Sequence, residues 1–187
     1  MTEQERALRR LAAFLDRQQV PYVVIGGLAV AVWGDPRATL DIDTSIWVPE
    51  DSVESFVLEA GNDFELLVDN PEAFVEETRV LPLRSAEGVR IDLIFGQLPF
   101  EKEAIESGIE IATGTGSVRF CTAEDLILMK ILSDRDRDQS DARGVTLRRM
   151  KQLDLEYLEP RLRELANLLE KPTILKRWEA WREEAEG

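Results

Sequence analysis

The sequence has no histidine and only one cysteine, and these two shortages narrow the chemistry that the chain can perform. Without histidine there is no serine–histidine triad, no imidazole general base and no histidine-ligated metal. The single Cys121 excludes an internal disulfide and a cysteine-based zinc site. Any metal ion bound here must therefore be a hard cation with oxygen ligands, such as Mg²⁺ or Mn²⁺.

Long apolar runs are also missing. No run approaches the roughly 20 residues that a membrane-spanning helix needs. The N-terminal stretch MTEQERALRRLAAFLDRQQ predicts a charged amphipathic helix and lacks the uncharged core of a signal peptide. We therefore expect a cytoplasmic protein with no membrane partner. Its 187 residues, 44% of them hydrophobic, suit one domain or one domain with a small helical appendix.

Positive charge is scarce. The chain has 23 lysine and arginine residues against 37 aspartate and glutamate residues, which gives a formal net charge of −14. Duplex DNA would be repelled by such a surface, so we expect no duplex DNA partner. The best local basic candidate is the segment from Arg143 to Lys151, which also fits the solvated face of a helix.

The order of apolar and polar residues predicts a mixed α/β (α+β) fold, with a small mixed sheet flanked by helices and a helical C-terminal region. A helix to about Arg17 comes first. Strands are expected at 22–25, 39–48, 63–68, 78–85, 89–96 and in a 109–120 hairpin whose turn contains Gly114 and Gly116. Helices are expected at 28–34, 49–60, 71–77, 99–107 and 126–133. A leucine stripe (Leu155, Leu158, Leu162, Leu165, Leu169) marks an amphipathic helix near the end.

Composition changes near Cys121. We therefore expect a catalytic core at residues 1–121 and a helical region at 122–187 that packs on it, or one continuous domain, with a cleft between the two parts.

Two acidic residues, Asp41 and Asp43, interrupt the second expected strand. Alternate residues of a strand share a face, so both side chains point the same way, while Leu40 and Ile42 point to the core. Two carboxylates on one face repel each other, and a divalent cation would relieve this. The alternative is an exposed face of an edge strand, because a D-x-D match is short.

Three further features have a functional and a structural interpretation. Gly26 and Gly27 would let backbone N–H groups approach a phosphate at a helix start, or would form a simple tight turn. Asp92, inside the apolar strand VRIDLIF, needs a metal or a salt bridge, for instance with Arg90 or Arg79. Lys130, on the apolar helix LILMKIL, would reach a triphosphate or extend its ammonium group to water.

Taken together, GGLAVAVWGDPRATLDID, RIDLIF and TAEDLILMKILSDRDRDQSD resemble the polymerase-β-like nucleotidyltransferase superfamily. Within it, the sequence is most similar to minimal bacterial nucleotidyltransferases of the AbiEii-like group, which includes abortive-infection and toxin–antitoxin members. The resemblance spans roughly residues 20 to 145. One departure is Gly27, where many relatives have serine, so one hydroxyl ligand of the phosphates is missing.

The resemblance implies a role for each matching residue. Asp41, Asp43 and Asp92 would bind Mg²⁺ (or Mn²⁺), and Asp92 would also deprotonate the acceptor hydroxyl. Residues of the nucleotide site would be Gly26, Gly27, Arg37, Thr39, Lys130 and Asp141, of which Lys130 would contact the phosphates and Asp141 is the family's late aspartate.

The resulting hypothesis is a metal-dependent nucleotidyltransferase that moves an NMP from an NTP to a hydroxyl acceptor. The acceptor would be a tRNA end, a protein side chain or a small molecule, and a cognate antitoxin protein is a further expected partner. Two alternatives remain. One is a nucleotidyltransferase fold that has lost catalysis and serves as a binding module, and the other is a D-x-D glycosyltransferase, which the short chain disfavours.

Overall fold

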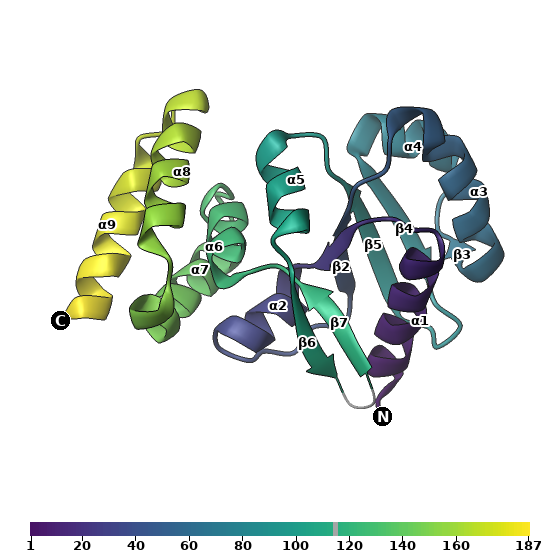
Figure 1. The fold of residues 1–187 in the computed structure, drawn as a ribbon, viewed down its shortest axis with the longest axis horizontal. Helices are drawn as coiled ribbons and strands as arrows, with labels where there is room; N and C mark the ends of the chain where they lie inside the picture. The colour runs from purple at the N-terminus through teal and green to yellow at the C-terminus, as the bar shows by residue number, and fades with distance from the viewer. Residues whose placement is uncertain (114–115) are drawn as a thin grey trace. The chain divides into compact units, whose positions relative to one another are not determined.

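The computed structural model describes residues 1–113 and 116–187 (Figure 1). Of the predicted hairpin turn, Gly114 lies outside the described residues. The chain forms two compact units. The first comprises Met1–Leu28 and Ala38–Cys121, and the second comprises Ala29–Arg37 and Thr122–Gly187. The predicted fold class, a mixed α/β fold with a helical C-terminal region, is confirmed.

The first unit is built on a seven-stranded mixed sheet with the order β3-β4-β5-β2-β1-β7-β6. The β2–β5 and β1–β7 pairs are parallel, and the other neighbouring strands are antiparallel. The strands are β1 (Tyr22–Val24), β2 (Ile42–Ile46), β3 (Glu65–Leu66), β4 (Val80–Arg84), β5 (Arg90–Phe95), β6 (Ile109–Thr113) and β7 (Gly116–Phe120).

An aromatic cluster packs helices of the first unit against this sheet. Phe14 contacts Phe56 and Phe64, with ring centroids 5.6 and 5.4 Å apart, and Phe56 lies 5.9 Å from Phe95 of β5. Since Phe95 and Asp92 are an odd number of positions apart in β5, the cluster covers the face opposite to Asp92. The helices of this unit are α1 (Glu3–Arg17), α3 (Val53–Asp63) after a 3₁₀ turn, α4 (Pro71–Thr78) and α5 (Pro99–Glu106).

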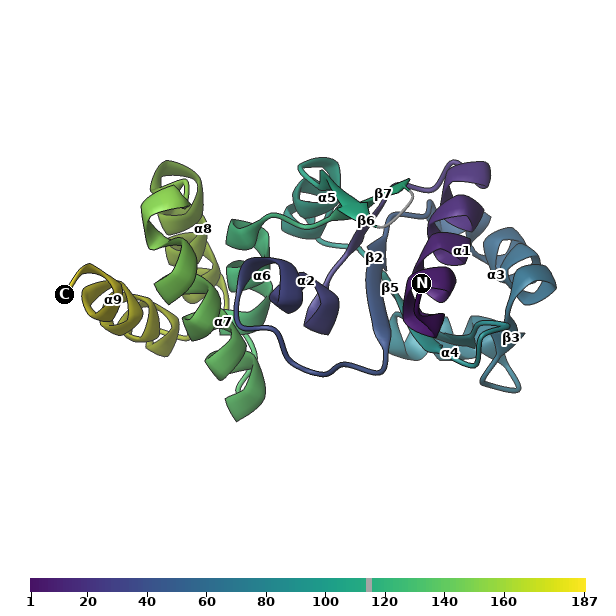
Figure 2. The same ribbon diagram turned by 90° about the horizontal axis from the view of Figure 1, so that it is seen from below.

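The second unit is helical. Helix α2 (Gly26–Trp33) begins in the first unit and ends in the second. The remaining helices are α6 (Ala123–Ile131), α7 (Asp136–Arg149), α8 (Leu155–Leu168) and α9 (Thr173–Glu186). Figure 2 shows α8 and α9 side by side. Three leucines of the predicted stripe, Leu158, Leu162 and Leu165, are buried, whereas Leu169 is 45% exposed. No helix formed by residues 1–113 and 116–187 is both long and apolar enough to cross a bilayer.

The strand predicted at 39–48 is shorter than expected. β2 begins at Ile42, so Asp41 precedes the strand, and Leu40, predicted to face the core, is 84% exposed. The reason is the partner strand. Ile42 pairs with Ile91, one residue after β5 begins, so the residues before Ile42 have little ladder to join. The helix predicted from residue 28 begins two residues earlier, at Gly26.

Candidate active site

Two of the three predicted metal ligands lie next to each other on the sheet. Asp43 of β2 is the register partner of Asp92 of β5. Neighbouring residues in register project to the same face of a sheet, so these two carboxylates share a face although 48 residues separate them in the chain. The same register gives the position of Asp41. Ile42 pairs with Ile91, so Asp41 and Arg90 lie just before these paired residues, at one end of the two strands.

Arg90 supplies the positive charge of this group. Its Nε and Nη2 atoms donate to the two carboxylate oxygens of Asp92 at 3.1 and 2.9 Å. This contact is the salt bridge considered as the alternative for Asp92; Arg79, the other partner considered, binds Glu101 instead. The hydrogen bond to Asp92 is the main cause of a raised Arg90 pKa, to which the charges of Asp92, Asp41 and Asp43 add, while burial acts in the opposite direction. One guanidinium therefore interacts with all three aspartates.

Gly26 and Gly27 bring the start of α2 against the same group. A Cβ atom at Gly26 would lie 2.0 Å from Oδ2 of Asp43, and Gly26 has a φ of +62°, so only glycine fits. A Cβ at Gly27 would lie 2.7 Å from Oγ1 of Thr39. The hydroxyl of Thr39 thus occupies the space that a serine at position 27 would need. The structure brings together Gly26, Gly27, Thr39 and Asp43.

The residues fit a hard divalent cation in donor chemistry and in charge. All the available donors are carboxylate oxygens, which Mg²⁺ and Mn²⁺ prefer. The guanidinium of Arg90 feels the charges of three carboxylates, and the Asp43 carboxylate lies directly on the glycine turn. The ligands are not already converged: within residues 1–113 and 116–187, no three acidic, cysteine or histidine residues form a ready cluster. Asp92 would have to turn from Arg90 to become a ligand.

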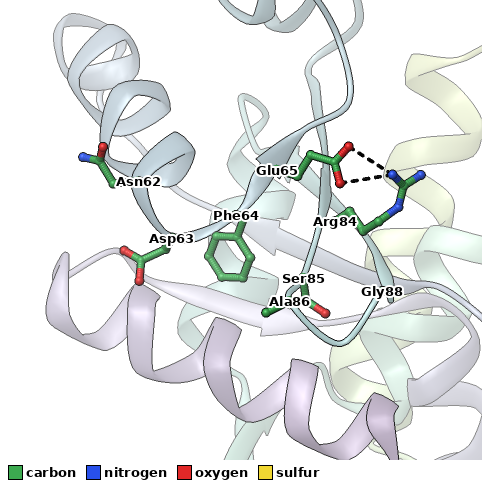
Figure 3. A pocket seen from close by; sticks show the side chains of 8 residues that line it. All are labelled: Asn62, Asp63, Phe64, Glu65, Arg84, Ser85, Ala86 and Gly88. Carbon is green, nitrogen blue, oxygen red and sulfur yellow. Dashed lines mark hydrogen bonds and ion pairs between the residues drawn. The ribbon is translucent and has the colours of Figure 1, made fainter.

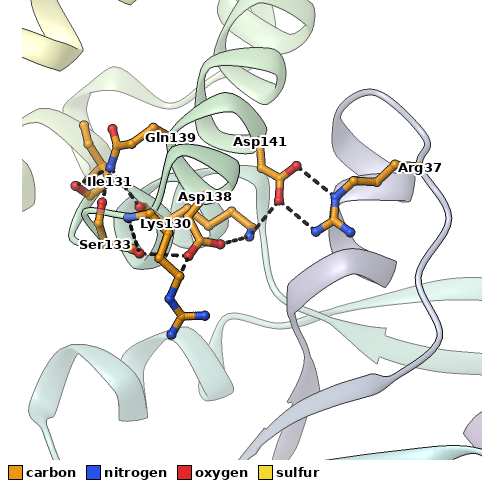
Figure 4. A network of polar contacts seen from close by, with 8 residues as sticks. Arg37, Lys130, Ile131, Ser133, Asp138, Gln139 and Asp141 are labelled. Atoms are coloured by element: carbon orange, nitrogen blue, oxygen red, sulfur yellow. Dashed lines mark hydrogen bonds and ion pairs between the residues drawn. The ribbon is translucent and has the colours of Figure 1, made fainter.

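The other predicted site residues form a network in the second unit, shown in Figure 4. Nζ of Lys130 lies 2.7 Å from Asp138 and 2.9 Å from Asp141. Arg37 donates from Nε and Nη2 to the two oxygens of Asp141 at 3.0 and 2.9 Å. Asp138 also accepts a hydrogen bond from the hydroxyl of Ser133. Lys130 is buried, so the alternative that its ammonium group extends to water is wrong.

These contacts lower the pKa values of both Asp138 and Asp141. Burial alone would raise the pKa of Asp141, but hydrogen bonds from Arg37 and Lys130 outweigh it and lower the pKa below its ordinary value. Burial likewise opposes the lowered pKa of Asp138, which results from hydrogen bonds with Lys130 and Ser133. Both side chains are therefore anionic at neutral pH, and the network is held by full charges.

Two cavities lie elsewhere in the first unit. The smaller, about 450 Å³, is lined by residues 62–65, 84–86 and Gly88, and the Glu65–Arg84 ion pair lies at its edge (Figure 3). The larger, about 880 Å³, is lined by residues that include Trp47, Val75 and Phe95. Neither cavity is lined by a predicted site residue. Charge and register mark the candidate site.

Two residues of these groups are more important in the structure than the sequence indicates. Arg90 was considered only as a neutralising partner of Asp92, although its position two residues earlier in a strand places both on one face. Asp138 has no distinguishing signal in the sequence, although it is a main partner of Lys130. The eight-residue spacing of Lys130 and Asp138 crosses a turn between two helices, so no helical periodicity could have indicated the pair.

Comparisons with known proteins identify the family and the fold. The model of a family described as nucleotidyl transferase of unknown function (DUF2204) matches residues 4–185. No curated protein matches the sequence. Among solved structures, an antigenic nucleotidyltransferase-like protein from Paracoccidioides brasiliensis is 18% identical, with a TM-score of 0.56 over 95% of this chain and 93% of that one.

A second similar structure is the antibiotic-resistance factor ANT(2″)-Ia. Its solution structure is 18% identical, with a TM-score of 0.54 over 89% of this chain and 95% of that one. The crystal structure of ANT(2″)-Ia in complex with adenylyl-2″-tobramycin is aligned with 14% identity and the same TM-score, over 86% of this chain and 95% of that one. At these identities the likeness shows the fold.

Proposed function

The chain belongs to the DUF2204 family of nucleotidyl transferases, and on that premise we propose that it moves an NMP from an NTP to a hydroxyl acceptor, with a divalent cation. The observation that carries the proposal is the position of Asp43. It lies in register with Asp92 on the neighbouring strand and against Gly26 at the start of α2. Acidic ligands and an anion-binding turn are the two parts that phosphoryl transfer requires.

Each residue of the first unit has a role in this proposal. The backbone N–H groups at Gly26 and Gly27 would hold the triphosphate, because the start of a helix attracts anions. The hydroxyl of Thr39 would add the hydrogen bond that Gly27 lacks. Asp41, Asp43 and Asp92 would hold Mg²⁺ or Mn²⁺, which when bound neutralises phosphate charge and makes the acceptor hydroxyl more acidic.

The bond changes are those of an in-line displacement at the α-phosphorus. The acceptor oxygen forms a bond to this phosphorus, and the bond to the bridging oxygen of the β-phosphate breaks, so that pyrophosphate leaves. Once the guanidinium of Arg90 has moved away from Asp92, the carboxylate of Asp92 takes the proton of the acceptor hydroxyl. The other residues orient the reactants, which is the main source of rate in such reactions.

Arg37, Lys130 and Asp141 have a more structural role in this proposal than the sequence suggested. Lys130 has two carboxylate partners, and Arg37 binds Asp141 through a bidentate contact. A phosphate would have to compete with these aspartates for both cations. Direct contact of Lys130, Arg37 or Asp141 with the nucleotide therefore stays a prediction.

We propose a small molecule with free hydroxyl groups as the acceptor. The net charge of −14 disfavours RNA. ANT(2″)-Ia, which shares the fold, has been crystallised with an adenylylated tobramycin, so aminoglycosides are the first compounds to test. A tRNA end and a protein side chain are the other acceptors. The AbiEii-like assignment, with a cognate antitoxin as partner and a cytoplasmic location, stays a prediction.

A second candidate function is nucleotide binding without catalysis. It is favoured by the missing hydroxyl at Gly27 and by the Arg90–Asp92 contact, which occupies both oxygens of the expected base. The presence of all three aspartates favours catalysis, because several like charges on one face of a sheet are costly unless they are used. The two functions differ in whether pyrophosphate is released.

The test is incubation of the full chain with each α-³²P-labelled NTP, Mg²⁺ or Mn²⁺, and separate acceptors: tobramycin, total tRNA and a protein extract. We expect one NTP to release pyrophosphate and to label one acceptor class, and EDTA to stop the reaction. Asp134→Asn, which removes a highly exposed carboxylate of the second unit, is the matched control and keeps the activity. Binding of NTP without pyrophosphate release under any condition would select the binding module.

A further inference from the structure

Arg90 lies where an incoming cation would bind, and it brings a positive charge to a group of aspartates. It opens β5, and Asp92 follows two residues later on the same face, with Asp43 in register beside it. The Nε and Nη2 atoms of Arg90 engage Oδ2 and Oδ1 of Asp92 at 3.1 and 2.9 Å. Both oxygens that a metal ion would use on Asp92 therefore already accept hydrogen bonds from a cation.

The electrostatic surroundings extend this pairing to the whole group. Asp43 is the register partner of Asp92, and Asp41 and Arg90 stand just before the paired Ile42 and Ile91, so the two further carboxylates lie at the same end of the strands as the guanidinium. A guanidinium spreads one charge over a plane, whereas a divalent cation concentrates two charges at a point. Three carboxylates attract the divalent cation more strongly, because it carries twice the charge of one guanidinium.

The exposure of the pair makes an exchange feasible. The side chain of Arg90 is 50% exposed and that of Asp92 is 21% exposed. The guanidinium can therefore swing into water without leaving a buried charge behind, and exposed ion pairs of this kind are weak. Asp92, the less exposed partner, would then be free to turn its oxygens to a metal ion.

We infer that Arg90 is the resident counter-ion of Asp41, Asp43 and Asp92, and that a divalent cation binds by displacing its guanidinium from Asp92. In the absence of the cation, Arg90 relieves repulsion among the carboxylates. During binding it competes, and so it sets the concentration of metal at which the site fills. The inference rests on the proposed function only for the assignment of the cation to these aspartates.

The test measures Mn²⁺ binding to the full chain without nucleotide, by the electron paramagnetic resonance signal of free Mn²⁺. We expect Arg90→Gln and Arg90→Met to lower the Mn²⁺ dissociation constant about tenfold, because a like charge and a competitor for Asp92 are both removed. Arg90→Lys keeps the charge and loses the bidentate geometry, so its dissociation constant should stay within about threefold of the wild-type value.

Arg84→Gln is the matched control. Arg84 is the register partner of Arg90 on β4, is 45% exposed, and binds both oxygens of Glu65 in place of an aspartate. Its loss should leave Mn²⁺ binding within about twofold of the wild type, because its charge is already matched by Glu65. Asp92→Asn should weaken Mn²⁺ binding both in the wild-type chain and when it is combined with Arg90→Gln. This result would assign the measured ion to this site.

The two neutral variants decide the inference. Equal or weaker Mn²⁺ binding by Arg90→Gln and Arg90→Met, in chains with a normal thermal transition, would overturn it. Absence of binding by the wild type and by both variants would overturn it as well. Neither result would decide the proposed function, because label transfer is measured separately and with NTP present. Tighter binding by the neutral variants alone, with Arg84→Gln unchanged, supports the inference.

Discussion

The two charged groups of this molecule differ in balance and in exposure. In the first unit, three aspartates share one guanidinium, and that guanidinium is half exposed. In the second unit, Asp138 and Asp141 are matched by Lys130 and Arg37, and Lys130 and Asp141 are buried. Breaking a buried ion pair destabilises a fold, whereas carboxylates that solvent can reach are open to a further cation. The comparison therefore supports the proposal that the first group binds the cation and that the second supports the fold.

The largest effect is expected from Asp43→Asn. This change removes a central ligand and should lower NMP transfer by about 10³-fold, while thermal stability stays equal or rises because repulsion among carboxylates is reduced. Activity is measured as pyrophosphate release, and stability as the melting temperature. A variant that keeps its activity, or one that unfolds, would contradict the division of roles between the two groups.

Asp141→Asn should show the opposite pattern. It leaves Lys130 and Arg37 with one carboxylate fewer in a buried network, so we expect a loss of about 2 kcal/mol in the free energy of unfolding. Urea denaturation of the full chain measures this. Asp134→Asn is the control, since Asp134 pairs with Lys171 and Arg177 at the surface, and its loss should have little effect. Equal losses in the two variants would mean that the network contributes nothing special.

The smallest effect is a dependence on pH. The pKa values of Asp138 and Asp141 are lower in the folded chain than the ordinary value of 3.8. A carboxylate of this kind stabilises the fold fully above pH 3.8 and loses its contribution as the pH falls through the lower folded pKa. Stability in urea should therefore fall as the pH is lowered below that value, and less steeply in Asp141→Asn. Parallel pH curves for the two chains would show that Asp141 contributes nothing to this dependence.

Much of the fold could be predicted because its signals are local. Helix α1 begins at a capping box of Thr2 and Glu5, and the β4–β5 turn contains Gly88 with a φ of +80°. The aspartates were visible because each one breaks an apolar pattern. The first residue of β2 could not be predicted, because it depends on where β5 pairs with this strand. That register is a property of two segments that are far apart in the chain.

The network of the second unit shows why the rest could not be predicted. Arg37 and Asp141 are 104 residues apart, and nothing in either local pattern indicates a partner at that distance. The sequence showed that Lys130 was unusual on an apolar helix, but a charged residue there fits both a ligand contact and an internal ion pair. Only the folded chain distinguishes the ligand contact from the internal ion pair, because the answer depends on which carboxylates α7 brings to Lys130.

The path of the chain has a practical consequence for dissecting the protein. The segment Ala29–Arg37 belongs to the second unit, although the residues on both sides of it belong to the first. It is fastened there by Asp35–Arg148, by Arg149 bonds to the carbonyls of Val32 and Trp33, and by the packing of Gly34 on Val145. A truncation after Cys121 would strip that segment of all these contacts and expose the apolar end of α2. Any fragment that is expressed should therefore contain both Ala29–Arg37 and Thr122–Gly187 in one polypeptide.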